Sequence, residues 1–211
     1  MRIGVLGGSF NPPHRGHLAL ARAALATGRL DQVVFIPAAS PPHKKAPSEA
    51  DAPTRLEMTR LLCGGDPRLS VDGLELERAG PSFTVDTIRR LRAVRPNDSH
   101  RLIVGSDMAL SFGIWRGPGE ILELAPPLVA ERPGAPLPDD DAPFPGLTNE
   151  ETAVLRAGRF PMEPVDINST MIRELFRNDA EDDEMLRLLT PEVLRFIRAR
   201  GLYGQALIRT D

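Results

Sequence analysis

The chain has 211 residues, of which 41% are hydrophobic and 26% are charged, so it is long enough to bury a sizeable core within a single domain. Its formal net charge of −3 argues against a protein that coats nucleic acid, and its single cysteine, Cys63, excludes an internal disulfide framework. Because the sequence shows neither a secretory pattern nor an apolar run that could span a bilayer, we expect a cytoplasmic protein that contacts neither membranes nor nucleic acid.

The first predicted unit is a strand, a glycine turn and a helix. Residues 3–6 form a short apolar run, Gly7-Gly8-Ser9 follows, and good helix formers occupy residues 15–25. A second apolar run at 32–37 predicts another buried strand. A helix between two buried strands is typical of a βαβ unit, so we expect a parallel sheet.

Two histidines, His14 and His17, lie at the start of this first helix. A helix start has free backbone N–H groups and a positive dipole end, which together bind anions. The spacing places both imidazoles on one side of the first turn. Gly16 lies between them and, having no side chain, is expected to let a phosphate or a purine approach the backbone. A lone histidine here would more often be a surface or capping residue, but the pair behind a glycine turn favours an anion site.

The later segments alternate between short apolar runs and helical patterns. The further predicted strands are 69–71, 74–77, 101–105, 127–130 and 160–167. The further predicted helices are 55–62, 84–91, 121–124, 148–157, 168–176 and 191–200. We therefore expect an α/β fold, a Rossmann-like, doubly wound and mainly parallel sheet flanked by helices, with a small helical C-terminal part at 168–203. The proline-rich acidic stretch 133–147 is expected to be a poorly ordered surface loop.

A basic loop follows the second predicted strand and contains Ser40, His43 and Lys44. Open α/β sheets bind ligands beyond the carboxyl ends of their strands, which is where these cations lie. Composition alone would also fit a solvated loop. We favour contact with a phosphate because the loop shares a sheet edge with the histidine pair.

Four other residues have a structural interpretation, and for two of them, Asp107 and Trp115, a functional one competes with it. Ser82 or Thr84 is expected to cap the helix that follows, and Asp107 either caps the next helix or hydrogen-bonds a nucleotide. Trp115 lies in a loop between two glycines, where the ring either joins the core or stacks on a flat aromatic ligand such as a pyridine.

A second anion site is predicted near the C-terminus. Ser169 and Thr170 offer hydroxyls and N–H groups at the start of the helix 168–176, and Arg173 lies one turn further on. The physical basis is the same as for the first histidine site.

Two patterns resemble the signatures of the nucleotidylyltransferase superfamily. The pattern Gly-x-Phe-x-Pro-x-His-x-Gly-His is complete from Gly8 to His17, and residues 167–173 are similar to the second motif. Further segments resemble the bacterial nicotinate-nucleotide adenylyltransferases. These segments are Pro-Pro-His-Lys at 41–44, Pro-Ser-Phe-Thr at 81–84, Gly-Ser-Asp at 105–107 with Trp115 after it, and Arg-Pro-Gly at 132–134.

The chain departs from this family pattern at a few positions. Asn11 stands where many relatives have aspartate, and Asn168 replaces the first serine of the second motif. Ala38 and Ala39 fall where several relatives have amide side chains near the nicotinate, which makes that contact depend on backbone groups. The acidic insert 133–147 is also unlike most relatives.

The resemblance implies adenylyl transfer from ATP to nicotinate mononucleotide in NAD biosynthesis, with Mg²⁺ held mainly by the substrate phosphates and not by a protein metal site. It implies catalytic roles for His14, His17 and Arg173. The implied ATP-binding residues are Gly8, Ser9, Phe10, His14, His17, Gly105, Asp107, Ile167, Ser169, Thr170 and Arg173. The implied residues for nicotinate mononucleotide are Ser40, His43, Lys44, Thr84, Trp115 and Arg132.

Two alternatives remain open, and a third is disfavoured by the sequence. A sister enzyme that acts on nicotinamide mononucleotide or pantetheine phosphate would share both signatures, and a non-catalytic nucleotide-binding regulator could share the fold. A class I aminoacyl-tRNA synthetase has a similar His-x-Gly-His element, but this chain has neither an anticodon-binding domain nor a lysine-rich second signature. The oligomeric state does not follow from the sequence.

Overall fold

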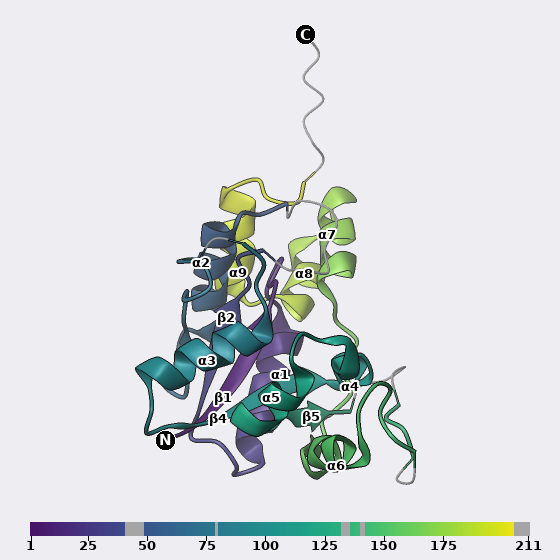
Figure 1. Ribbon diagram of the computed structural model, residues 1–211. Helices are drawn as coiled ribbons and strands as arrows, with labels where there is room; N and C mark the ends of the chain where they lie inside the picture. Colours follow the sequence, from purple (N-terminus) through teal and green to yellow (C-terminus); the bar gives the residue numbers. More distant parts are fainter. Residues whose placement is uncertain (41–48, 79, 132–135, 140–141, 205–211) are drawn as a thin grey trace.

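The computed structural model describes residues 1–40, 49–78, 80–131, 136–139 and 142–204 (Figure 1). Within them, a six-stranded sheet has the order β3-β2-β1-β4-β5-β6, and every neighbouring pair of strands is parallel. The strands are β1 Arg2–Gly8, β2 Gln32–Pro37, β3 Leu69–Val71, β4 Ser99–Gly105, β5 Leu128–Ala130 and β6 Arg159–Phe160. This strand order is that of a doubly wound, Rossmann-like sheet, which confirms the predicted fold class.

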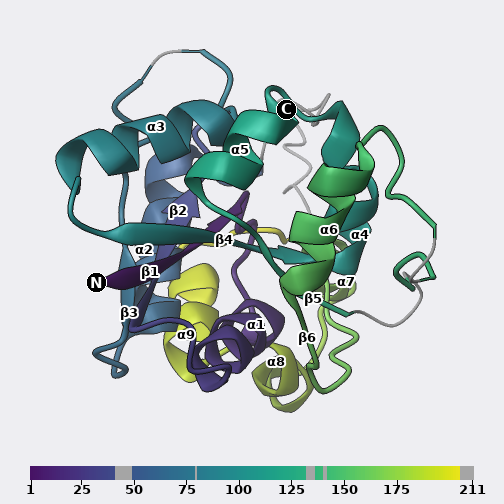
Figure 2. The same cartoon turned by 60° about the horizontal axis from the view of Figure 1, so that its bottom comes forward.

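Helices cover both faces of the sheet (Figure 2). One face packs against α1 Arg15–Ala26, α2 Ala52–Cys63, α7 Ser169–Arg177, α8 Asp182–Leu188 and α9 Pro191–Ala199. The other face packs against α3 Thr84–Val94, α4 Ser106–Leu110, the 3₁₀ turn Phe112–Ile114, α5 Pro118–Leu124 and α6 Asn149–Ala157. Along β2, Val33 and Phe35 point to the first face, whereas Val34 and Ile36 point to the second. Both faces are buried, which explains why the strands are continuous apolar runs.

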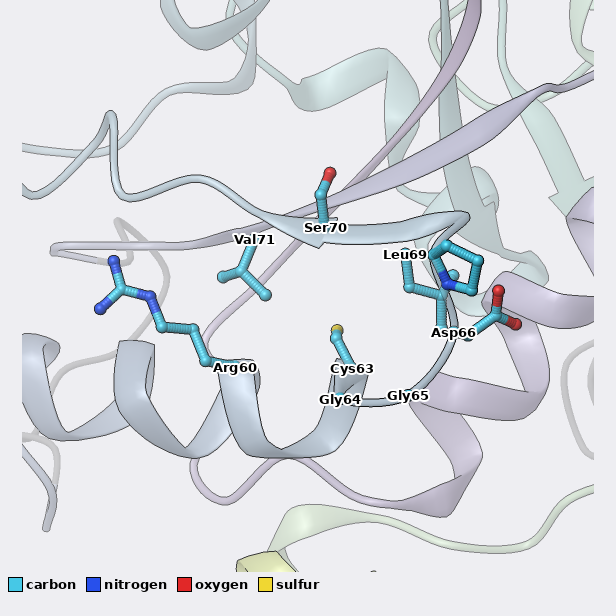
Figure 3. Close-up of a pocket in the computed structure, with 9 residues that line it drawn as sticks. Arg60, Cys63, Gly64, Gly65, Asp66, Leu69, Ser70 and Val71 are labelled. Carbon is cyan, nitrogen blue, oxygen red and sulfur yellow. The ribbon is translucent and has the colours of Figure 1, made fainter.

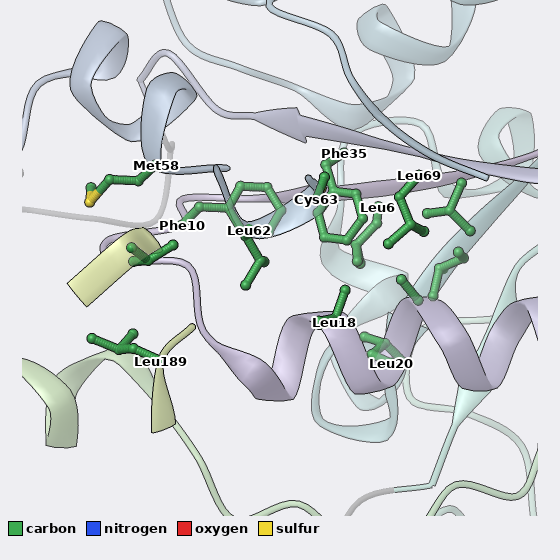
Figure 4. Close-up of a cluster of buried hydrophobic side chains, with 14 of the residues drawn as sticks. Leu6, Phe10, Leu18, Leu20, Phe35, Met58, Leu62, Cys63, Leu69 and Leu189 are labelled. Atoms are coloured by element: carbon green, nitrogen blue, oxygen red, sulfur yellow. The ribbon is translucent and has the colours of Figure 1, made fainter. Parts of the chain in front are cut away.

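Phe10, in the turn after β1, packs into the hydrophobic cluster on the sheet face that carries α1 and α2 (Figure 4). Its side chain is 1% exposed, and its ring centroid lies 5.7 Å from that of Phe35. The backbone of Phe10 has a φ of 46°, in the left-handed region that non-glycine residues rarely adopt. A Cβ on Gly8 would lie 3.0 Å from the Phe10 ring, so this glycine allows the ring to fold back over the turn. The buried Phe10 side chain therefore fixes the start of the loop that leads into α1.

Two predicted strands are corrected by the structure. The segment 74–77 forms turns, in which the Leu76 N–H donates to Gly73 and the Arg78 N–H to Glu75. Backbone bonds to residues three positions back are typical of turns and not of a strand, whose bonds go to a neighbouring strand. The strand predicted at 160–167 is only Arg159–Phe160, because its partner β5 is itself three residues long. The short α4, α8 and 3₁₀ turn have too few residues to show a periodic pattern.

The described part of the 133–147 segment is attached to α6. Phe144 is 1% exposed, and its N–H donates to the hydroxyl of Thr152 at 3.1 Å. Arg156 donates to the carbonyl of Asp139 at 2.6 Å. Every helix in the part of the chain that the structure describes is too short or too polar to cross a membrane.

Candidate active site at the carboxyl end of the sheet

Two of the predicted ATP-binding residues, Gly8 and Gly105, mark the point where β1 and β4 end. These two strands are neighbours, yet the chain leaves β1 toward β2 on one side while β4 lies on the other. Gly8 is the last residue of β1 and Gly105 is the last residue of β4. Such a switch point opens a crevice at the carboxyl ends of the strands, and open α/β sheets bind their ligands there.

The histidine pair is brought together as predicted. His14 is the N-cap of α1 and is 3% exposed, and its ring centroid lies 3.7 Å from that of His17. The His14 N–H donates to Nδ1 of His17 at 3.2 Å. Because this Nδ1 is an acceptor, a neutral His17 carries its proton on Nε2 and is a hydrogen-bond donor there. The edge-on ring of Phe10, with centroids 4.9 Å apart, supports the His17 imidazole.

Gly16 leaves room for the side chain of His14. A Cβ at this position would lie 3.0 Å from Nδ1 of His14 and 3.5 Å from the carbonyl oxygen of Ile167. The space that the glycine leaves is therefore filled by the His14 ring and by the segment before α7. The glycine therefore allows His14 to pack against its own helix, and the approach of a phosphate or a purine to the backbone at this point stays a prediction.

The second predicted anion site adjoins the first. Asn168 is the N-cap of α7, and its Oδ1 accepts from the Met171 N–H at 2.9 Å. Asparagine is a preferred N-cap residue, so the departure from serine at this position keeps the helix capped. The Ser169 hydroxyl donates to the carbonyl of Pro12 at 2.9 Å. This bond joins the start of α7 to the loop that leads into α1.

Arg173 lies between the two motifs. Its guanidinium donates to the carbonyl of Asn11 at 2.8 Å and to the Thr170 hydroxyl at 3.2 Å. Its Nε is 3.1 Å from a carboxylate oxygen of Glu49, which also pairs with Arg177 at 2.6 Å. An anion therefore already contacts the guanidinium that the sequence assigns to phosphate binding.

Ser82 does not cap α3, contrary to the prediction. The N-cap is Phe83, which makes no side-chain cap bond, and Thr84 is the first residue of the helix. The Ser82 hydroxyl instead accepts from the N–H groups of Ala39 at 3.1 Å and Ser40 at 3.3 Å. The capping prediction failed because this hydroxyl is engaged by the loop after β2, which is remote in sequence.

Trp115 is both packed and accessible. It is partly buried, and its ring centroid lies 5.0 Å from that of Phe112 with the rings tilted by 31°. Arg116 lies over the Phe83 ring at 4.8 Å, which places the Trp115 turn against the start of α3, where Thr84 begins the helix. The two residues predicted to contact the nicotinate ring thus belong to adjoining segments.

For the remaining predicted residues the structure gives only a position in the fold or no description. Asp107 is the second residue of α4, whose N-cap is Gly105, so Asp107 is not the N-cap and its nucleotide role stays a prediction. His43, Lys44 and Arg132 lie outside the described residues.

Sequence reasoning missed Arg55, which lies on α2 and is 1% exposed. Its guanidinium donates to the carbonyls of Ser9 at 2.6 Å and Ala38 at 2.7 Å. Desolvation by burial lowers the pKa of this guanidinium. A signal was present, because Arg55 occupies the buried stripe of α2 together with Met58 and Leu62.

A surface pocket of about 480 Å³ lies elsewhere, between the end of α2 and β3 (Figure 3). Its lining includes Arg60, Cys63 and Asp66 and none of the predicted site residues. Burial raises the pKa of Cys63 to about 12, so its thiol stays protonated at neutral pH and is a poor nucleophile. No group of three or more His, Cys, Asp or Glu side chains in the described ranges could hold a metal ion.

Comparisons with known proteins show which family this chain is similar to. The model of the cytidylyltransferase-like family matches residues 5–175. A probable nicotinate-nucleotide adenylyltransferase of Geobacillus kaustophilus is 37% identical over 211 residues, which cover 100% of this chain and 89% of the relative. A probable nicotinate-nucleotide adenylyltransferase of Bordetella petrii is 41% identical over 203 residues, with 96% and 98% covered.

A solved structure shares the fold. The nicotinic acid mononucleotide adenylyltransferase of Plasmodium falciparum, complexed with NaAD, has a TM-score of 0.73 at 13% identity and covers 96% of this chain and 97% of its own. The sequence matches extend over nearly the whole chain and include both anion-binding motifs. The chain therefore belongs to the cytidylyltransferase-like family and, within it, to the nicotinate-nucleotide adenylyltransferases.

Proposed function

We propose that this protein transfers the adenylyl group of ATP to nicotinate mononucleotide, forming deamido-NAD and pyrophosphate in NAD biosynthesis. The observation that carries the proposal is the junction of two helix starts, where Ser169 bonds Pro12 and Arg173 bonds Asn11 beside the histidine pair. Two N-terminal dipoles, two imidazoles and one guanidinium converge there, which suits a chain of phosphates.

The chemistry needs alignment more than proton transfer. A phosphate oxygen of the mononucleotide attacks the α-phosphorus of ATP, a new P–O bond forms, and the bond to the pyrophosphate leaving group breaks. The second pKa of a phosphate monoester is about 6, so the nucleophile is already ionised at neutral pH and no general base is required. The protein has to bring two anions together in line and neutralise the charge that builds on the leaving group.

The described residues are suited to these tasks. We assign His17 Nε2–H and His14 to the ATP phosphates, and Arg173 with the helix start at Ser169 and Thr170 to the β- and γ-phosphates. Gly105 and Asp107 would border the adenosine, and Thr84 and Trp115 the nicotinate ring. His43 and Lys44 are assigned to the mononucleotide phosphate by sequence alone, as is Arg132 to the nicotinate side.

Mg²⁺ would enter with ATP. The imidazoles, guanidinium, hydroxyls and N–H groups at the junction suit phosphate oxygens and not a hard cation, and the Glu49 carboxylate there is paired with Arg173 and Arg177. The phosphates and water would therefore supply most of the ligands. When bound, the ion neutralises phosphate charge. The assigned residues orient the same phosphates from the protein side.

The test is pyrophosphate release from ATP and Mg²⁺, with nicotinate mononucleotide, nicotinamide mononucleotide and pantetheine phosphate in parallel reactions. A strong preference for nicotinate mononucleotide is expected. Equal use of both mononucleotides would replace the proposal with a dual-specificity enzyme. Release with pantetheine phosphate alone, or tight ATP binding without release, would overturn it in favour of a sister transferase or a regulator.

A further inference from the structure

Arg55 is a buried guanidinium that bonds backbone carbonyls from three segments. Nη1 donates to Ser9 at 2.6 Å, Nη2 to Ala38 at 2.7 Å, and Nε to Ala50 at 3.2 Å. A second bond from Nη2 reaches Ala39 at 3.3 Å. The side chain is 1% exposed, and its described hydrogen-bond partners are all neutral carbonyls. The carboxylates of Asp51 and Glu75 act on it only through their electrostatic field, which raises its pKa against the larger effect of burial. A buried guanidinium with no described hydrogen bond to a carboxylate is costly, so a role beyond packing is expected of it.

The bonded carbonyls belong to the two loops that leave the ends of β1 and β2. Ser9 lies in the loop that leads to the histidine pair, and Ala38 lies in the loop that leads to Ser40. The two loops touch directly as well, because the Ala38 N–H donates to the carbonyl of Gly8 at 2.8 Å. The planar fork of Arg55 therefore spans two loops with donors held at a fixed separation.

Ser82 holds the second loop from the opposite side. Its hydroxyl accepts from the N–H groups of Ala39 and Ser40, and its own N–H donates to the carbonyl of Ser40 at 3.0 Å. The segment 38–40 is thus bound through its carbonyls by Arg55 and through its amides by Ser82. Ser82 precedes α3, at whose start Thr84 lies.

We propose that Arg55 is a positioning residue for adenylyl transfer. Its guanidinium sets the spacing between the loop after β1, which contains Ser9 and leads to the ATP-binding histidines, and the loop after β2, which contains residues 38–40 and is assigned to the acceptor. The inference rests on the proposed function for the identity of the two ligands. In-line displacement tolerates little error in this spacing, since a displacement of about 1 Å can cost roughly 10²-fold in rate. The same guanidinium adds positive potential beneath a site for two anions.

The test compares Arg55→Met and Arg55→Lys with Arg60→Met and Arg60→Lys. Arg60 lies on the same helix, pairs at the surface with Glu57 at 3.6 Å, and contacts neither loop in the described structure, so it is the matched control. At saturating substrates, kcat of both Arg55 variants is expected to fall by about 10²-fold. Lysine keeps the charge but not the fork, so it should not rescue the rate. The Arg60 variants should stay within about 2-fold of the wild type.

A second measurement does not depend on activity. Amide hydrogen exchange in the ligand-free Arg55→Met protein is expected to accelerate at Ala38, Ala39 and Ser40 and to remain unchanged at Val34 in the middle of β2. If the wild-type protein transfers no adenylyl group, the proposed function is refuted. Faster exchange in Arg55→Met would then still show that Arg55 connects the two loops. Unchanged exchange, or wild-type kcat in a folded Arg55→Met protein, would overturn the positioning role.

If the Arg55 variants do not fold, the Ser82→Ala variant tests the same loop connection. Ser82 is partly exposed, and its hydroxyl bonds the same segment, so removing it should preserve the fold while accelerating exchange at Ala39 and Ser40. In this variant kcat is expected to fall by more than the loss of folded protein, judged from the change in Tm, can account for. A lower Tm with wild-type kcat would show that the spacing of the loops does not limit transfer.

Discussion

The hydroxyl of Tyr203 donates a hydrogen bond of 2.7 Å to Oδ1 of Asn11, 192 positions away in the sequence. Both residues are buried, and the backbone carbonyl of Asn11 also accepts from Arg173. Asn11 belongs to the loop that leads into the histidine pair. The C-terminal helical part therefore holds this loop through a side-chain bond and a backbone bond.

Tyr203→Phe is expected to lower the free energy of unfolding by about 1–3 kcal/mol, because Oδ1 of Asn11 would stay buried without its donor. Urea unfolding measures this loss. The contribution of the bond itself is isolated by a double-mutant cycle with Asn11→Ala. Additive losses in the cycle would show that the two side chains are not coupled and that the hydroxyl of Tyr203 does not stabilise the protein through Asn11.

His17→Gln is expected to reduce kcat by roughly 10²-fold or more, the scale of losing one donor to the transition state. Glutamine at the third helical position can still accept from the N-cap N–H, so the start of α1 should be preserved. Steady-state kinetics with thermal unfolding of the same samples separates the two effects. Wild-type turnover would remove His17 from the catalytic assignment.

The sequence predicts well what depends on local pattern. Residues 32–37 and 69–71 were expected as strands with the bounds that β2 and β3 show, because apolar runs and turn residues determine such segments. The contacts of Ser82 and Arg55 could not be predicted in this way. The partners of Ser82 are backbone groups 42 and 43 positions away, and those of Arg55 are backbone groups 17 and 46 positions away. Every residue has the same backbone groups, so the residue type of a partner does not reveal such a contact.

The histidine pair shows the same limit within one motif. The spacing of His14 and His17 predicts their proximity, since it follows from helix geometry. The filling of the space at Gly16 depends on the rotamer of His14 and on Ile167, which arrives from the far end of the chain. A local pattern cannot supply that second contact.

Glu49→Gln is expected to lower the KM for ATP several-fold. In the ligand-free protein the Glu49 carboxylate contacts Arg173 at 3.1 Å and Arg177 at 2.6 Å, and ATP phosphates would have to displace it. Removing the negative charge removes this competition. The control is Glu57→Gln, which breaks a surface pair with Arg60 at 3.6 Å. If both variants have wild-type KM values, Glu49 does not compete with ATP.

Stability is expected to fall as the pH drops below about 6.5, the ordinary pKa of histidine. His100 is 2% exposed on β4, and burial lowers its pKa while Asp98 opposes that shift. Below 6.5 the unfolded chain binds the proton more readily than the folded chain, so unfolding becomes more favourable until the folded pKa is also passed. His100→Leu should flatten this part of the pH profile of Tm. A profile identical to that of the wild type would place the acid sensitivity elsewhere.

Gly113→Ala is expected to disturb the acceptor side of the site. An added Cβ would lie 2.3 Å from the carbonyl oxygen of Pro145, so either the Pro145 segment or the Trp115 turn has to move. The KM for nicotinate mononucleotide should rise several-fold while the KM for ATP changes little, because only the acceptor is assigned to Trp115. Gly64→Ala is the control, since its Cβ would meet only the Leu61 carbonyl oxygen at 3.4 Å and the Arg60 carbonyl oxygen at 3.8 Å. A lower Tm with both KM values unchanged would mean that Trp115 packs against Phe112 without contacting the acceptor.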